Sequence, residues 1–87
     1  MTEYHILRSG RKVGIVDVTN KGVSILSDSG KNNLLQYMGS EFNLVRTKIM
    51  GKVTEYVYSI SKPATNVMQV LVRLQATLEG SGYEIST

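Results

Sequence analysis

Short apolar runs separated by polar, glycine-bearing turns fill the first third of the chain. The runs lie at residues 3–8, 12–19 and 22–27, and they carry many of the β-branched side chains typical of strands. The turn at 8–12 places Gly10 where a tight hairpin needs a positive φ. The turn at 19–22 is typical of a type I turn followed by a left-handed Gly22 that forms a bulge. These patterns predict three consecutive antiparallel strands.

A polar segment and a second strand pair follow. Residues 27–40 are rich in Ser, Asp, Gly and Asn, which predicts a loop, with one or two helical turns at 32–38 closed by Gly39. Residues 41–50 and 52–61 predict two longer strands joined at Gly51 and Lys52, because a glycine in the first position of a two-residue turn favours type II′.

The turn also decides which residues face one another in this second hairpin. A two-residue turn at 51–52 places Lys48 opposite Glu55 and Arg46 opposite Val57. A shift by one residue would place Arg46 opposite Glu55 instead. In both registers Glu55 neutralises part of the basic charge of the hairpin.

Residues 64–80 fit two periodicities. In a helix, five apolar residues would lie on one face at the spacing of an amphipathic helix. They are Val67, Val70, Leu71, Leu74 and Leu78. A strand would alternate apolar and polar residues from position 70 to position 79. We favour the helix because seventeen residues is long for a strand, and because Pro63 and Gly80 stand at its two ends. A turn and a short final strand would complete the chain.

Together these elements predict one α+β domain spanning residues 1–87. It would be an antiparallel sheet of about five or six strands, in the order βββ(α)ββαβ, with the C-terminal helix packed on one face. The pattern does not distinguish an open sheet from one curled into a small barrel. No apolar run approaches the length of a membrane span and no signal peptide is recognisable, so we expect a cytoplasmic protein without a membrane partner.

Composition argues against an enzyme. The chain contains no cysteine and a single histidine, His5, which is more typical of a half-buried strand residue than of a general base. Its seven Asp and Glu residues are scattered, and no nucleophile, phosphate-binding or calcium-binding motif is present. We therefore predict a non-enzymatic protein with neither a cofactor nor a metal.

The leading functional prediction is a protein-interaction module, acting as an accessory factor or inhibitor on a larger assembly. Beside its core stripe the predicted helix carries a second apolar flank formed by Met68, Val72 and Ala76. Such a flank suits a protein partner or a second copy in a homodimer, and an exposed strand edge offers another route to pairing.

The alternative prediction is a nucleic-acid-binding protein. The chain has a net charge of +3, and nine of its ten Lys and Arg residues lie in the first 62 positions. Basic side chains at the hairpin turns and on one strand would contact phosphates, and two strand tyrosines would stack on bases. These candidates are Arg8, Arg11, Lys12, Lys21, Arg46, Lys48, Lys52, Tyr56 and Tyr58.

Overall fold

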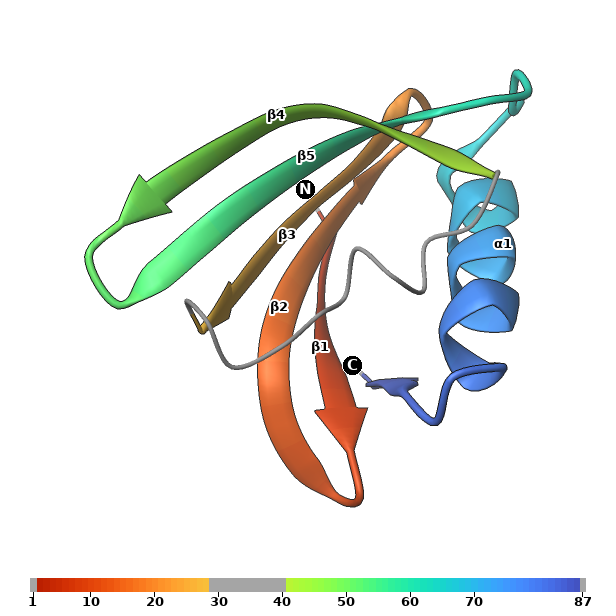
Figure 1. The fold of residues 1–87 in the computed structure, drawn as a ribbon. Coiled ribbons are helices and arrows are strands. Elements are labelled where there is room, and N and C mark those ends of the chain that lie inside the picture. Colours follow the sequence, from red (N-terminus) through yellow and green to blue (C-terminus); the bar gives the residue numbers. More distant parts are fainter. Residues whose placement is uncertain (1, 29–40, 87) are drawn as a thin grey trace.

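The computed structural model describes residues 2–28 and 41–86 (Figure 1). Its elements are β1 (Thr2–Arg8), β2 (Arg11–Thr19), β3 (Gly22–Asp28), β4 (Phe42–Met50), β5 (Val53–Ile60), α1 (Val67–Glu79) and β6 (Glu84–Ser86). The strands form one antiparallel sheet in the order β4-β5-β3-β2-β1-β6. This sheet is open, with β4 and β6 at its edges, so it does not curl into a barrel. The predicted helical turns at 32–38 lie outside the described residues.

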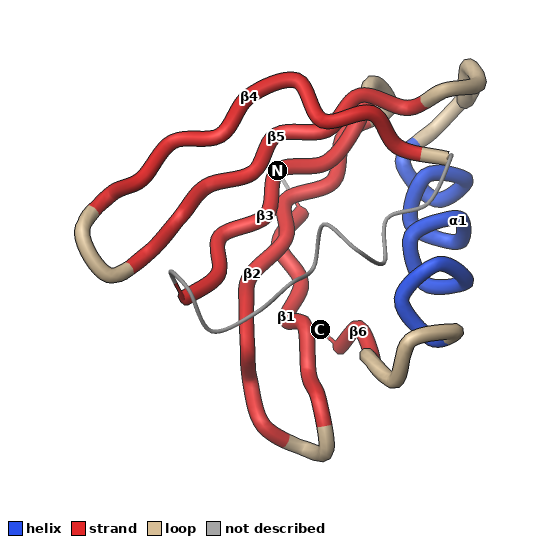
Figure 2. Tube along the Cα trace, viewed as in Figure 1, coloured by secondary structure: helices blue, strands red, loops and turns tan. Residues whose placement is uncertain are grey.

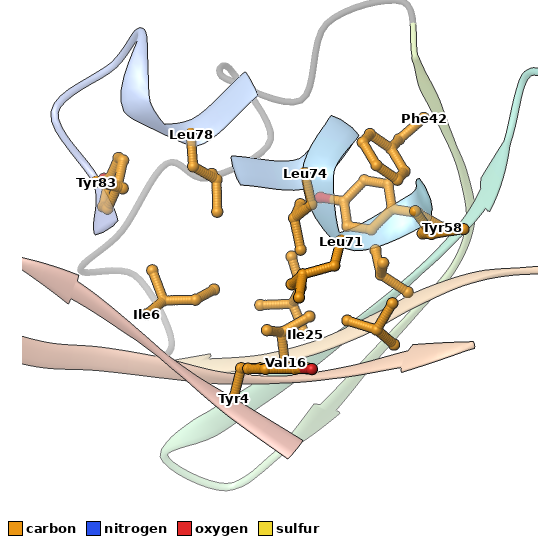
Figure 3. Close-up of a cluster of buried hydrophobic side chains, with 13 residues drawn as sticks. Tyr4, Ile6, Val16, Ile25, Phe42, Tyr58, Leu71, Leu74, Leu78 and Tyr83 are labelled. Carbon is orange, nitrogen blue, oxygen red and sulfur yellow. The ribbon is translucent and has the colours of Figure 1, made fainter. Parts of the chain in front are cut away.

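Helix α1 lies across one face of the sheet (Figures 1 and 2), and the side chains of the core lie between the two (Figure 3). Alternate positions of the central strands point toward the helix, and their side chains are the buried ones. Tyr83, in the turn before β6, closes one end of the cluster (Figure 3). The buried apolar side chains are Tyr4, Ile6, Val16, Val18, Val23, Ile25, Phe42, Tyr58, Val70, Leu71, Leu74, Leu78 and Tyr83.

The helical interpretation of residues 64–80 is confirmed, and the strand alternative is wrong. Asn66 is the N-cap, and its side chain accepts a hydrogen bond from the Gln69 backbone N–H at 3.0 Å. The Gln69 side chain in turn accepts from the Thr65 backbone N–H at 3.1 Å. The predicted core face is the buried face, with Val67 half-buried at its start.

The first and last hairpin turns match their predicted geometry. Gly10 has φ 79° and its neighbour Ser9 has φ 54°, the two positive values of a type I′ turn. Gly51 has φ 66° and stands first in the two-residue turn between Met50 and Val53, as type II′ requires.

The middle turn corrects one prediction. Gly22 does not have a positive φ, and it pairs directly with Thr19 without a bulge. The turn is held by the Thr19 hydroxyl, which donates to the Gly22 carbonyl and accepts from the Lys21 N–H, both at 3.2 Å. A Cβ atom at Gly22 would collide with the Tyr58 carbonyl oxygen of β5. This position therefore needs glycine because another strand lies against it.

Candidate protein-interaction surfaces

The exposed large apolar side chains of the described residues lie on two elements only, β4 and α1. On β4, the exposed fractions are 46% for Leu44, 64% for Val45, 75% for Ile49 and 41% for Met50. We call these four residues the β4 surface. On α1, Met68 and Val72 are 61% and 55% exposed. Exposed apolar residues that gather in this way are typical of contact surfaces.

The position of β4 in the sheet explains its exposure. In the part of the chain that the structure describes, β4 pairs with β5 alone, and of its nine residues only Phe42 is buried. The tip of the β4–β5 hairpin extends away from α1, so the helix covers only the beginning of β4 (Figure 1). Among residues 2–28 and 41–86, the apolar side chains of β4 beyond Phe42 are therefore exposed and not covered by the helix.

Register assigns the side chains of β4 to the two faces of the sheet. Leu44 lies opposite Tyr58 and Ile49 opposite Thr54, which places them on the face that carries the helix. A bulge between Leu44 and Arg46 shifts the register by one residue and leaves Val45 as the extra residue. After the bulge, Arg46 to Met50 pair with β5 without interruption.

Val45 lines a shallow hollow on the face opposite the helix. The hollow has a volume of about 290 Å³, and its wall is completed by strands β2, β3 and β5 and by the β2–β3 turn, through Asp17, Lys21, Ser24, Val57 and Ser59. Near β4 its lining includes two apolar residues, Val45 and Val57, and Val57 lies opposite Arg46, the residue that follows Val45. The hollow is thus a recess next to β4, the edge strand of the described sheet.

The same face of β4 carries the basic side chains. Of the two registers left open by the sequence, the one set by a two-residue turn is observed, with Lys48 opposite Glu55 and Arg46 opposite Val57, and the shifted one is wrong. The Arg46 guanidinium nevertheless reaches the Glu55 carboxylate diagonally, at 3.7 Å. The Arg46 side chain is 66% exposed, so solvent screens this ion pair and it contributes about 1 kcal/mol or less. One carboxylate thus faces two cations at the edge of the sheet.

The predicted apolar flank of the helix lies at the surface. Met68, Val72 and Ala76 are all exposed, and we call them the helix surface. Met68 and Val72 border a shallow hollow that also includes Arg73. The Arg73 guanidinium donates to the Lys62 carbonyl at 2.7 Å and to the Pro63 carbonyl at 3.3 Å, which ties the preceding loop to the helix.

The predicted nucleic-acid candidates do not form one patch. Arg8, Arg11 and Lys12 lie at the β1–β2 turn, where the Arg8 guanidinium stands 5.4 Å from the centre of the Tyr83 ring. Lys21 lies in the β2–β3 turn, at the opposite end of β2. Lys52 lies at the tip of the β4–β5 hairpin, away from both of these turns (Figure 1), and Arg46 and Lys48 lie on β4.

The two strand tyrosines face the core. Tyr58 is 3% exposed and its ring lies among the core side chains near Phe42 and Leu71 (Figure 3). Tyr56 is half-buried and packs against the same cluster. Burial raises the pKa of the Tyr58 phenol far above its ordinary value of 10, and the neighbouring Tyr56 adds to this shift. Tyr58 therefore does not present a ring face on which a base could stack.

Sequence reasoning named a strand edge as a route to pairing, but it did not identify the β4 surface. A signal was present, because apolar residues in 42–50 fall on both faces of the strand instead of alternating. Such a strand is either buried on both faces or exposed at an edge of the sheet. The choice between these two cases depends on the order of the strands in the sheet, which the sequence does not provide.

His5 and Asp17 lie in β1 and β2, and their Nδ1 and Oδ1 atoms are buried without a hydrogen-bond partner. Among residues 2–28 and 41–86, no three His, Asp or Glu side chains are grouped so that they could hold a metal ion. Within the same ranges, no helix has the length and apolar character needed to cross a membrane.

In comparisons with known proteins, no family model matches the chain, and no curated protein or solved structure is significantly similar to it.

Proposed function

We propose that this chain is a small, non-enzymatic protein-interaction module that acts as an accessory factor or inhibitor on a larger assembly. The observation that carries the proposal is the gathering of exposed large apolar residues on β4 and α1. Elsewhere in the described residues the large apolar side chains are buried or half-buried, so these two elements stand out from the rest of the surface.

The energetics support contact through more than one side chain. Fully burying a Leu, Ile, Val or Met side chain contributes about 1.5–3 kcal/mol, so covering the exposed parts of the β4 surface contributes on the order of 4 kcal/mol. Association costs at least a similar amount in lost translational and rotational freedom. A stable contact must therefore add backbone hydrogen bonds along the strand edge, or must include the helix surface as well.

Nucleic-acid binding is the second candidate. The observation that favours it is the exposure of Arg8, Arg11 and Lys12 together at the β1–β2 turn. Against it, the turn offers no exposed aromatic ring, since the Arg8 guanidinium lies over Tyr83 and that ring is 1% exposed.

A random-peptide phage-display library, selected on the purified protein, tests the leading proposal. Two matched double variants locate the contact: Val45→Glu with Ile49→Glu on the β4 surface, and Met68→Glu with Val72→Glu on the helix surface. Each variant introduces two carboxylates at exposed positions and serves as the control for the other. We expect enriched peptides to bind the wild type and to lose at least about tenfold in affinity on one of the two variants.

Two outcomes would overturn the proposal. The first is a library from which no peptide is enriched. The second is enriched peptides that bind both variants as tightly as the wild type. Fluorescence anisotropy with DNA and RNA distinguishes the second candidate, because phosphate contacts give binding that weakens steeply with salt and that is lost when Arg11→Glu is combined with Lys12→Glu.

A further inference from the structure

We infer that β4 accepts an extended, acidic segment of a partner protein as a seventh strand of the sheet. This inference rests on the proposed function and specifies the partner. It depends on three features of the edge: its length, its charge and the hollow beside it.

The two edges of the sheet differ in length. β6 has three residues, whereas β4 has nine and leaves one side unpaired along the described chain. Very short edge strands are one way in which proteins prevent unwanted pairing. The β4 edge lacks that protection, and from Arg46 to Met50 its register is regular. An added strand would gain backbone hydrogen bonds over this stretch.

The side chains of this regular stretch specify an alternating partner. Arg46 and Lys48 point to the face opposite the helix, while Thr47 and Ile49 point to the face that carries it. A strand laid beside β4 would place every second residue next to the two cations and the intervening residues next to Ile49. The complementary pattern is therefore acidic and apolar in alternation.

Charge also argues against a second copy on this edge. β4 carries two basic residues and no acidic residue. An antiparallel pair of β4 strands centred on Thr47 would place Arg46 of one copy opposite Lys48 of the other. A pair centred on Arg46 or on Lys48 would place like residues opposite each other. Like charges in directly opposed positions destabilise strand pairing, so the edge favours a partner of opposite charge.

The hollow beside the edge provides an anchor. The bulge leaves Val45 on its rim, next to Val57, at the point where the regular stretch begins. A volume of about 290 Å³ accommodates one large apolar side chain. We therefore expect the partner segment to carry an aromatic or branched apolar residue just beyond its acidic positions.

The test uses three synthetic nine-residue peptides, matching the length of β4. One alternates valine with glutamate, one alternates valine with lysine, and one has the first peptide's composition with its glutamates in a single block. Binding is measured by fluorescence anisotropy at low and at physiological ionic strength. Backbone amide hydrogen exchange, followed by NMR, locates the contact on the chain.

We expect the alternating glutamate peptide to bind about tenfold more tightly than the other two. Between Arg46 and Met50, the amides that point away from β5, every second one along the strand, should become protected when it binds. The double variant Arg46→Glu with Lys48→Glu should reverse the preference toward the lysine peptide. The matched variant Arg11→Glu with Lys12→Glu, which makes the same charge change at the β1–β2 turn, should leave the preference unchanged.

A substitution at Glu55 provides a further test of peptide affinity, because Glu55 neutralises part of the positive charge that would attract the peptide. Glu55→Gln removes the carboxylate that lies 3.7 Å from Arg46 and opposite Lys48. We expect this variant to bind the glutamate peptide about threefold more tightly. Circular dichroism and thermal unfolding of each variant verify that the fold is retained.

Several results would overturn the inference. They are equal binding of the three peptides, a preference that survives the reversal at Arg46 and Lys48, or protection that falls outside β4. A dimer seen in sedimentation that Ile49→Glu abolishes would show that the occupant is a second copy. If the synthetic peptides fail but displayed peptides still require the β4 surface, the partner chemistry is wrong and the proposed function stands. If displayed peptides also fail, both proposals are refuted.

Discussion

The backbone of β5 passes so close to Gly22 that any side chain there would disturb the pairing of two strands. A Cβ atom at this position would collide with the Tyr58 carbonyl oxygen and would lie 3.1 Å from the Ser59 Cα. Both obstacles are backbone atoms of a central strand, so they cannot move aside as a flexible side chain can. We predict that Gly22→Ala destabilises the protein by about 1–3 kcal/mol, the usual range for overpacking.

A second substitution separates this steric cause from a conformational one. Asparagine tolerates the left-handed region far better than alanine does, so a glycine needed only for positive φ can be replaced by asparagine at little cost. Gly22→Asn should therefore be at least as damaging as Gly22→Ala. Gly10 is the matched control, because it has φ 79° and open space around its Cβ position. There we expect Gly10→Asn to be tolerated and Gly10→Ala to cost about 1 kcal/mol.

Urea unfolding followed by circular dichroism measures these differences as shifts of the midpoint at constant slope. For a chain of 87 residues a loss of 1 kcal/mol also lowers Tm by about 4–8 °C. A Gly22→Asn variant as stable as the wild type would refute the steric argument and favour a left-handed conformation at Gly22. A Gly22→Ala variant without any loss of stability would show that β5 moves away at no cost.

Three further predictions concern the core, the start of the helix and the buried phenol. Leu74 is a fully buried residue of α1, so Leu74→Ala should cost about 2–5 kcal/mol in urea unfolding. Val72→Ala, on the exposed side of the same helix, should change stability by less than about 0.5 kcal/mol. Asn66→Ala removes the N-cap and should cost about 1 kcal/mol, while Asn66→Asp should retain most of it, as measured by thermal unfolding. Burial raises the pKa of Tyr58 in the folded state, so the folded form keeps the proton that the unfolded form releases above pH 10. The unfolding free energy should therefore fall as pH rises through 10, and Tyr58→Phe should reduce that fall, which urea titrations on either side of pH 10 would measure.

Local patterns predicted much of this fold because their causes are local. The apolar residues of α1 recur at the period of a helix and so form a stripe along one side. That stripe is the face that the protein buries, so the sequence alone identifies it. A two-residue turn at Gly51 and Lys52 accounts for the register from Arg46 to Met50, one of the two registers that the sequence left open. The bulge at Val45 was not predicted, because the neighbouring residues contain no pattern that is typical of an extra residue in an antiparallel strand pair.

Features that depend on strand order could not be predicted in the same way. β3 pairs with β5, and this crossover pushes β4 to the edge of the sheet. The pattern of apolar and polar residues in 41–61 does not show which of the two strands of that hairpin pairs with β3. The orientation of Tyr58 toward the core follows from the face that α1 covers, and the need for glycine at position 22 follows from the strand beside it. Each depends on contacts between segments far apart in the sequence.

In the proposed strand addition, the charge of the β4 edge would act in two ways, on pairing between copies of the chain and on pairing with a partner. An exposed strand with apolar residues on both faces is a template for uncontrolled pairing, and basic residues on an edge are a common protection against it. Arg46 and Lys48 oppose the approach of another β4, yet the same charges attract an acidic strand. Glu55 sets the balance, because it offsets one of the two cations and leaves an excess of one positive charge beside an apolar strip. The charges that oppose pairing between copies of the chain are therefore the same charges that would favour the proposed acidic partner.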